Sequence, residues 1–199
     1  MGNDANCLCK VLCSEDSIFK MTDDAWNNAC INIRVHDKLD LYAAGYKRAS
    51  DILAAHVIST GMGLDACIYP ILFLYRHYLE LRLKELLHSG SKLLSKNYTM
   101  KSTHSLIRLW SDARPLVHEI FPDGDAAELD SLERLLSEFS RIDEKSEAFR
   151  YPVNKKGAMY LDDIKYINVR NLIEILAKVE SLLDGISCAV SAYLENMVK

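Results

Sequence analysis

Residues 71–87 read Ile-Leu-Phe-Leu-Tyr-Arg-His-Tyr-Leu-Glu-Leu-Arg-Leu-Lys-Glu-Leu-Leu, and this stretch decides the fold. Its first five residues are apolar on every side of a helix, which predicts a central, buried element. Charged residues follow from Arg76 onward at spacings of three and four, so that they can pair along one helix face. We predict a helix over residues 64–88, with its regular part beginning near Pro70 and with Gly90 as its stop.

The segments on either side also carry the apolar period of a helix. Further helices are predicted over residues 37–60, from a Thr103 cap to the turn at Pro122, over 125–144, and from an Asn168 cap to Met197. The first of these presents the stripe Leu39, Tyr42, Tyr46, Ala49, Leu53 and His56. Pro115 is expected to kink or divide the second, because proline cannot donate the helical hydrogen bond.

The last helix alternates spacings of three and four from Val169 to Met197. A helix of that length spans roughly 45 Å, which is more than a domain of this size is expected to cover. We therefore expect its C-terminal half to pack on a second copy of the chain or on a partner protein.

Composition agrees with an all-α fold in one domain. The chain has 199 residues with only 8 Gly and 4 Pro, few breakers for so long a chain. We predict a bundle of four to five helices over 37–199, preceded at 1–36 by an arm or one short helix around Asp23 to Ile33. The net charge of -4 provides no overall attraction to phosphate backbones, although a local basic patch remains possible.

The sequence predicts a cytoplasmic protein that does not insert into a membrane. The longest apolar run, Ala66 to Tyr75, is about half of the ~20 residues that a membrane span needs. Cys7, Cys9 and Cys13 cluster, but no CxxC pair or nearby His completes a four-ligand zinc site, so reduced thiols and no metal are expected. Glycine-rich phosphate loops, HExxH and GxSxG do not occur, and no cofactor is expected.

Three segments follow one another in an order that resembles the HEPN superfamily of prokaryotic helical domains. These are the helix at Tyr75–Leu87, the helix start Thr103-His104-Ser105-Leu106, and Phe149-Arg150-Tyr151-Pro152, with a long amphipathic helix last. The resemblance covers roughly residues 64–190. Ser105 stands where the family usually has Asp.

The resemblance implies a helical bundle that is commonly a dimer. Members belong to toxin–antitoxin and phage-defence systems, and many are metal-independent ribonucleases with an Arg, a polar residue, and a His after four to six intervening residues. Arg82 and His88 have that spacing, but Leu83 replaces the polar residue and the helix lies earlier than usual. A solvated helix face is the alternative for this pair.

Catalytic chemistry, if present, is expected from residues outside that motif. Arg76 could grip a phosphate and His77 could move a proton, with His104 and Arg150 completing the centre. The alternatives are structural: an ion pair between Arg76 and Glu80, and a capping hydrogen bond at His104.

The irregular stretch 145–162 and the residues before it are the predicted binding loop for a nucleotide or RNA. Arg150 would contact phosphate, and an aromatic ring would stack on a base. The candidate binding residues are Asp143, Ser146, Phe149, Tyr151, Lys155 and Lys156. Alternatively, Phe149 and Tyr151 anchor the loop on the bundle, and Arg150 pairs with Asp143 or a helix C-terminus.

Two functions follow from these residues. The first is a HEPN-like component of a bacterial phage-defence or toxin–antitoxin system that binds RNA or a nucleotide and can cleave RNA without a metal. The second is a non-catalytic helical dimer or adaptor whose partner carries the activity. A small-molecule enzyme on a helical bundle is a third possibility. One cleft gathering Arg76, His77, His104 and Arg150 would favour the first, and separate ion pairs would favour the second.

Overall fold

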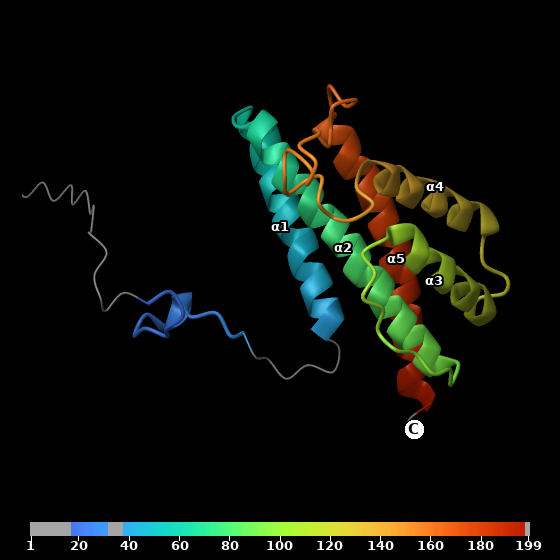
Figure 1. Cartoon of the computed structure of the whole chain (residues 1–199). Helices are drawn as coiled ribbons and strands as arrows, with labels where there is room; N and C mark the ends of the chain where they lie inside the picture. The colour runs from blue at the N-terminus through green and yellow to red at the C-terminus, as the bar shows by residue number, and fades with distance from the viewer. Residues whose placement is uncertain (1–16, 32–37, 198–199) are drawn as a thin grey trace, which may run out of the picture. The chain divides into compact units, whose positions relative to one another are not determined.

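A computed structural model describes residues 17–31 and 38–197 of the chain (Figure 1). The predicted all-α fold with a long final helix is confirmed. The α-helices are α1 (Lys38–Thr60), α2 (Leu64–Leu93), α3 (Leu106–Ile120), α4 (Ala126–Ile142) and α5 (Val169–Met197). Within the described residues, the only β-pairing is an isolated bridge between Val153 and Met159. None of the described helices is both long and apolar enough to cross a bilayer.

The chain divides into two units, 1–36 and 37–199. The first unit was predicted to be an arm or one short helix, and its described part contains a 3-10 turn at Ala25–Asn27. Thr22 and Asn28 exchange two hydrogen bonds across this turn, of 3.1 and 2.7 Å. The cluster of Cys7, Cys9 and Cys13 lies outside the described residues.

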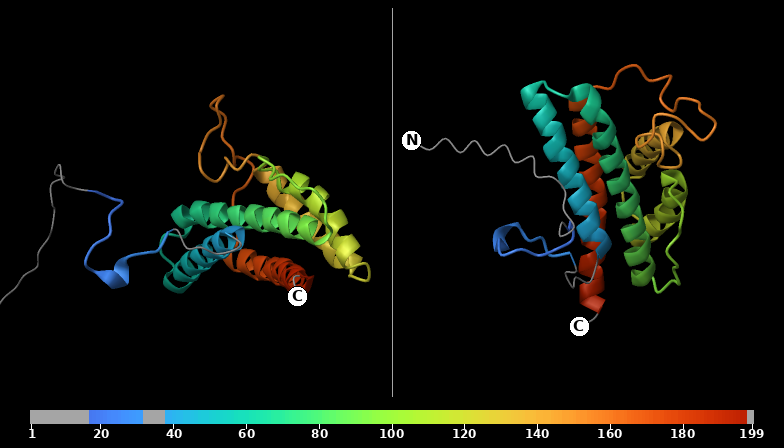
Figure 2. Two further views of the ribbon diagram at one scale, coloured as in Figure 1. Left: turned by 90° about the horizontal axis from the view of Figure 1, so that it is seen from below. Right: turned by 60° about the vertical axis from the view of Figure 1, so that its left-hand side comes forward.

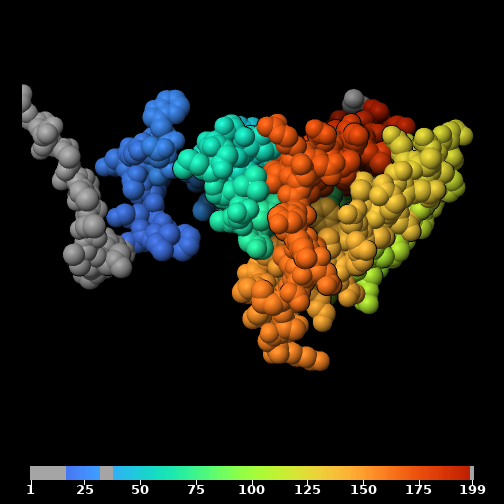
Figure 3. All heavy atoms as spheres, turned by 90° about the horizontal axis from the view of Figure 1, so that it is seen from above, coloured from blue at the N-terminus to red at the C-terminus, as the bar shows by residue number. Residues whose placement is uncertain are grey.

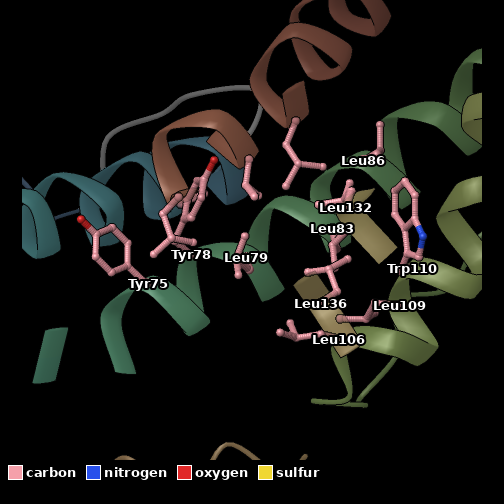
Figure 4. Close-up of a cluster of buried hydrophobic side chains, with 14 of the residues drawn as sticks. Tyr75, Tyr78, Leu79, Leu83, Leu86, Leu106, Leu109, Trp110, Leu132 and Leu136 are labelled. Carbon is pink, nitrogen blue, oxygen red and sulfur yellow. The ribbon is translucent and has the colours of Figure 1, made fainter. Parts of the chain in front are cut away.

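In the second unit, α2 is the central helix. It packs against α1, α3 and α5, while α4 packs on α3 (Figures 1 and 2). Its leucines meet those of α3 and α4 in the core shown in Figure 4, and the buried residues there include Leu79, Leu83, Leu86, Leu106, Leu109, Trp110, Leu132 and Leu136. The run that is apolar on every side is central because α2 has neighbours on several sides.

The predicted stop of α2 is wrong, since the helix continues through Gly90 to Leu93. Gly90 is buried against α3, and a Cβ on it would lie 3.5 Å from Cδ1 of Ile120. The left-handed residue that follows the helix is Ser95, with φ of 54°. Packing against α3 therefore outweighs the weak helix propensity of glycine.

The buried face of α1 is displaced by one residue from the predicted stripe. Tyr42 and His56 are exposed, whereas Tyr46 and Leu53 are half-buried at the flank. The residues facing the core are Ala43, Lys47, Ser50, Ala54 and Val57. Their small or flexible side chains let α1 approach α2 closely, and the Ser50 hydroxyl donates a 3.0 Å hydrogen bond to the carbonyl of Ile71.

The start and the continuity of α3 also differ from the prediction. The capping residue is Ser105, whose side chain accepts the N–H of Arg108, while Thr103 accepts the N–H of Ser105. Pro115 is exposed and does not divide the helix. The expected cap of α5 is confirmed, because Asn168 accepts the N–H of Asn171 at 3.0 Å.

The apolar stripe of α5 is largely covered by its own chain. With 29 residues, α5 is about as long as α2 with 30, and it packs against both α2 and α1. Val190 is fully buried, and Tyr193 packs on Phe121 with ring centroids 5.9 Å apart. The predicted second copy is therefore not needed to bury this stripe, and dimerisation stays a prediction.

Candidate functional site

Arg76 of α2 is completely buried and joins three parts of the chain. Its Nη2 donates a 2.7 Å hydrogen bond to the carbonyl of His104 and a 3.4 Å bond to that of Glu144, and its Nε donates to the carbonyl of Asp143 at 3.0 Å. Its Nη1 pairs with the Glu80 carboxylate at 3.2 Å. No substrate can contact a guanidinium enclosed in this way, so Arg76 has the structural role that was the alternative to catalysis.

Glu80 is the buried centre of the same cluster. Its Oε1 accepts Lys84 Nζ at 2.8 Å and lies 2.9 Å from Nδ1 of His104. Burial on its own would raise the pKa of Glu80, but the hydrogen bond and charge of Lys84, together with His104, outweigh burial and lower that pKa. Glu80 is therefore an anion at neutral pH, as a buried carboxylate with two cationic neighbours and a hydrogen-bonded imidazole should be.

His104 is the member of this cluster that reaches the surface. Its side chain is 59% exposed, although Nδ1 is turned toward the buried Glu80. An ionised carboxylate can only accept hydrogen bonds, so Nδ1 carries a proton, and in the neutral form of the imidazole Nε2 carries the lone pair. A carboxylate that orients an exposed imidazole is the arrangement that supports general acid–base catalysis.

His77 lies on the same face of α2, one turn before Glu80. Its ring stacks on Phe73 with centroids 5.9 Å apart and an interplanar angle of 9°, and it meets Tyr46 of α1 edge-on at 4.4 Å. Burial lowers the pKa of His77, and the charges of Lys84 and Arg76 lower it further against the opposing effect of Glu80. The imidazole is therefore neutral at pH 7.

Arg150 continues this row of rings from the irregular segment between α4 and α5. Its guanidinium lies 5.7 Å from the Phe73 ring centroid and 5.5 Å from that of Tyr151, and its Nε donates to the carbonyl of Ser146 at 2.5 Å. Arg150 does not pair with Asp143, the alternative considered above. Its cationic group is exposed and remains available to an anion.

Asp143 and Ser146 shape the turn that presents Arg150. Oδ1 of Asp143 accepts the N–H groups of Glu147 at 2.6 Å and Ala148 at 3.1 Å, and Oδ2 lies 3.3 Å from Arg76 Nε. Ser146 is buried with φ of 60°, the left-handed conformation that lets the chain turn sharply. These two predicted binding residues therefore build the loop, and their side chains are not accessible to a ligand.

The other predicted binding residues divide between the core and the surface. Phe149 is buried and packs edge-on against Phe139 at 6.5 Å, so it anchors the loop as the alternative held. Tyr151 is 54% exposed. Lys155 and Lys156 are exposed in a tight turn around Gly157, where Asn154 accepts the N–H of Lys156.

The Arg82 and His88 pair is not a site. The Arg82 side chain is 5% exposed and forms ion pairs with Asp40, Glu85 and Asp184, at 2.7, 3.4 and 3.0 Å. His88 is exposed and meets the ring of Tyr98 edge-on. Arg82 thus holds α1, α2 and α5 together, which also corrects the alternative of a solvated face for this residue.

Two grooves flank the irregular segment. One, of about 710 Å³, lies among α2, α4 and α5 and is lined chiefly by leucine, isoleucine and phenylalanine. The other, of about 870 Å³, lies between the first turns of α2 and the irregular segment, which Figure 3 shows in orange beside the teal turn between α1 and α2. Arg150 and Tyr151 line the second groove, whereas neither groove is lined by Arg76, His77 or His104.

The four predicted catalytic residues therefore do not line one cleft, so the outcome that would favour the ribonuclease is not met. They do not disperse into separate ion pairs either, because Arg76 and His104 share Glu80, and His77 and Arg150 both contact Phe73. His77 belongs to α2, whereas His104 contacts α2 at Glu80 and Arg150 contacts it at Phe73. Arg76 is buried and binds the backbone of the loops that carry His104 and Arg150. Phe73 and Glu80 are seven residues apart, so Arg150 and His104 are separated by about 10 Å along the helix axis. Sequence reasoning missed Phe73, Glu80 and Lys84 as site residues, although with His77 they recur at spacings of four, three and four and so share a face.

Comparison with known proteins identifies no relative of this chain: no protein-family model, no curated protein and no solved structure matches it.

Proposed function

We propose that this chain is a HEPN-like component of a bacterial phage-defence or toxin–antitoxin system that binds RNA along α2 and cleaves it at His104. The observation that carries the proposal is the contact between His104 and Glu80, an exposed imidazole oriented by a buried, ionised carboxylate. We call the row formed by His77, Phe73 and Arg150 the strip along α2. All three segments that carry the HEPN resemblance supply residues to the Glu80 cluster or to this strip, which supports the family proposal.

The proposed reaction uses the 2′-hydroxyl of RNA as the nucleophile. Nε2 of His104 takes the proton of that hydroxyl, the 2′-oxygen bonds to phosphorus, and the bond from phosphorus to the 5′-oxygen breaks as water supplies a proton to the leaving oxygen. Lys84, beside the same carboxylate, places positive charge near the developing phosphorane. Arg150 contacts a neighbouring part of the strand, because it lies too far along α2 to share one phosphate with His104.

The test is cleavage of a labelled RNA of mixed single- and double-stranded structure by the purified full chain. Wild type should yield fragments ending in 2′,3′-cyclic phosphate, and a 2′-deoxy substitution at the cleaved position should block that cut. His104→Ala should slow cleavage by roughly 10²- to 10⁴-fold, the usual contribution of general acid–base catalysis. His118→Ala, at an exposed histidine of α3, is the matched control and should cleave like wild type.

Expression in bacteria provides a cellular counterpart. Wild type should slow growth and reduce total RNA, whereas Arg150→Ala and His77→Ala should do so less. Intact RNA in vitro together with identical, harmless behaviour of all variants in cells would rule out a nuclease.

A non-catalytic dimer or adaptor is the second candidate, favoured by the apolar residues that α5 leaves uncovered at its end. Tyr193 is 47% exposed and Met197 is 64% exposed. Light scattering would then give twice the 22.6 kDa chain mass, and Tyr193→Ser with Met197→Ser would return it to one chain. A monomer at high concentration would exclude the homodimer.

A further inference from the structure

We infer that the groove between the start of α2 and the irregular segment is a binding site for unpaired nucleotides, separate from the proposed cleavage position at His104. The inference rests on the proposed function that RNA binds along α2. It adds that the bound RNA is unpaired. It concerns residues that no sequence motif singled out, Tyr69, Lys165 and Tyr166.

The groove presents three accessible tyrosine rings. Tyr69 of α2 is 48% exposed, Tyr151 is 54% exposed and Tyr166 is 95% exposed, and all three line the same groove. Tyrosines exposed to this extent do not contribute their full area to the core. A phenol ring presents an apolar face and a polar tip, which suits it to stacking against the face of a base.

The row of rings along α2 leads directly into this groove. His77 stacks on Phe73, Phe73 contacts the guanidinium of Arg150, and Arg150 contacts Tyr151 at the groove wall. In this proposal a strand bound at His104 and His77 would next meet the guanidinium of Arg150 and then the tyrosines. The groove thus extends the strip along α2 at the end away from Lys84.

The charges of the groove decide which form of RNA it accepts. Arg150 and Lys165 line it, but Asp65 and Asp162 line it as well, so its formal charge is balanced. A duplex hides its bases and is held chiefly through its phosphates, which requires an excess of cations. The groove lacks that excess, so its contribution to recognition comes from the open tyrosine faces, which stack only on bases that are unstacked and unpaired.

The test measures binding of two fluorescein-labelled RNAs to the full chain by fluorescence anisotropy, with His104→Ala as the background so that the probe stays intact. One probe is a single-stranded 12-mer, and the other is the same strand in a blunt duplex. The single strand should bind at least about tenfold more tightly. Tyr166→Ala and Tyr69→Ala should each weaken its binding by roughly 5- to 100-fold, the effect of losing one stacked base.

Two controls accompany these variants. Tyr42→Ala removes a tyrosine of α1 that is 52% exposed and lies outside the groove, and it should bind like the background protein. A tenfold increase in salt should weaken binding of the single strand by no more than about 25-fold, the value for two neutralised phosphates.

The outcomes separate this inference from the proposed function. If RNA binds but the duplex binds as well as the single strand, or if Tyr69→Ala and Tyr166→Ala bind like Tyr42→Ala, the groove is not the site and the proposed function stands. If neither RNA binds, the inference and the proposed function both fail.

Discussion

Nη2 of Arg76 donates a 2.7 Å hydrogen bond to the main-chain carbonyl of His104, across 28 residues of chain. The same guanidinium holds the carbonyls of Asp143 and Glu144, so one buried side chain fixes both loops that supply the exposed site residues. The position of His104 relative to α2 therefore depends on a group that no ligand touches.

Arg76→Leu should lower the free energy of unfolding by about 3–5 kcal/mol, because Oε2 of Glu80 and the backbone carbonyls that Arg76 binds lose their buried donor. Urea denaturation followed by circular dichroism measures this loss. Arg48→Leu, at an exposed arginine of α1, should change the free energy by less than about 0.5 kcal/mol. Equal effects of the two substitutions would show that the buried network contributes little to stability.

Gly90→Ala should stabilise the protein by about 0.5–1 kcal/mol, since Gly90 lies inside α2 and its added methyl group would only reach ordinary contact with Ile120 at 3.5 Å. Gly63→Ala is the contrasting variant. Gly63 has φ of 71°, which strains any residue with a Cβ, so this change should destabilise by about 1 kcal/mol or more. Thermal unfolding of both proteins gives the two signs, and destabilisation by Gly90→Ala would contradict the packing described here.

Glu80 should make stability depend on pH in the acid range. Because the folded pKa of Glu80 is lowered, the unfolded state binds its proton first as pH falls. The stability that Glu80 contributes is complete above its unfolded pKa of about 4.3 and is lost as pH falls through the folded pKa. The stability difference between wild type and Glu80→Gln should thus be largest at pH 7 and shrink by pH 3, as urea denaturation at both values can measure. A difference that stays constant with pH would show that Glu80 is not ionised in the fold.

His77 should titrate below about pH 6.5, the ordinary value for histidine, because burial against Phe73 and Tyr46 lowers its pKa. Proton NMR of the imidazole measures that midpoint. The unfolded state then binds the proton more readily, so His77 should reduce stability as pH falls from about 6.5 through the folded pKa. Phe73→Ala should move the midpoint upward by opening the ring to water, whereas an unchanged midpoint would show that the stack does not bury His77.

Local sequence patterns were sufficient for the main elements of the bundle. The apolar run at 71–75 predicted a central helix, and Asn168 predicted the start of α5. The face of α1 was misplaced by one residue because hydrophobicity marks Tyr42 and Tyr46, whereas close packing on α2 selects Ala43 and Ser50. Gly90 was misjudged for the same reason: propensity is local, and the contact with α3 is not.

The site divides along the same line. The sequence by itself determined which groups are available, a row at Phe73, His77, Glu80 and Lys84 on one helix face with His104 and Arg150 in the loops, because helical spacing is a property of neighbouring residues. Only the tertiary structure decided that Arg76 and Phe149 are buried, that the exposed His104 contacts Glu80, and that Tyr69 of α2 shares a groove with Tyr151 and Tyr166 of the irregular segment. Contacts between residues far apart in the chain depend on how the helices pack, and no local period specifies that packing.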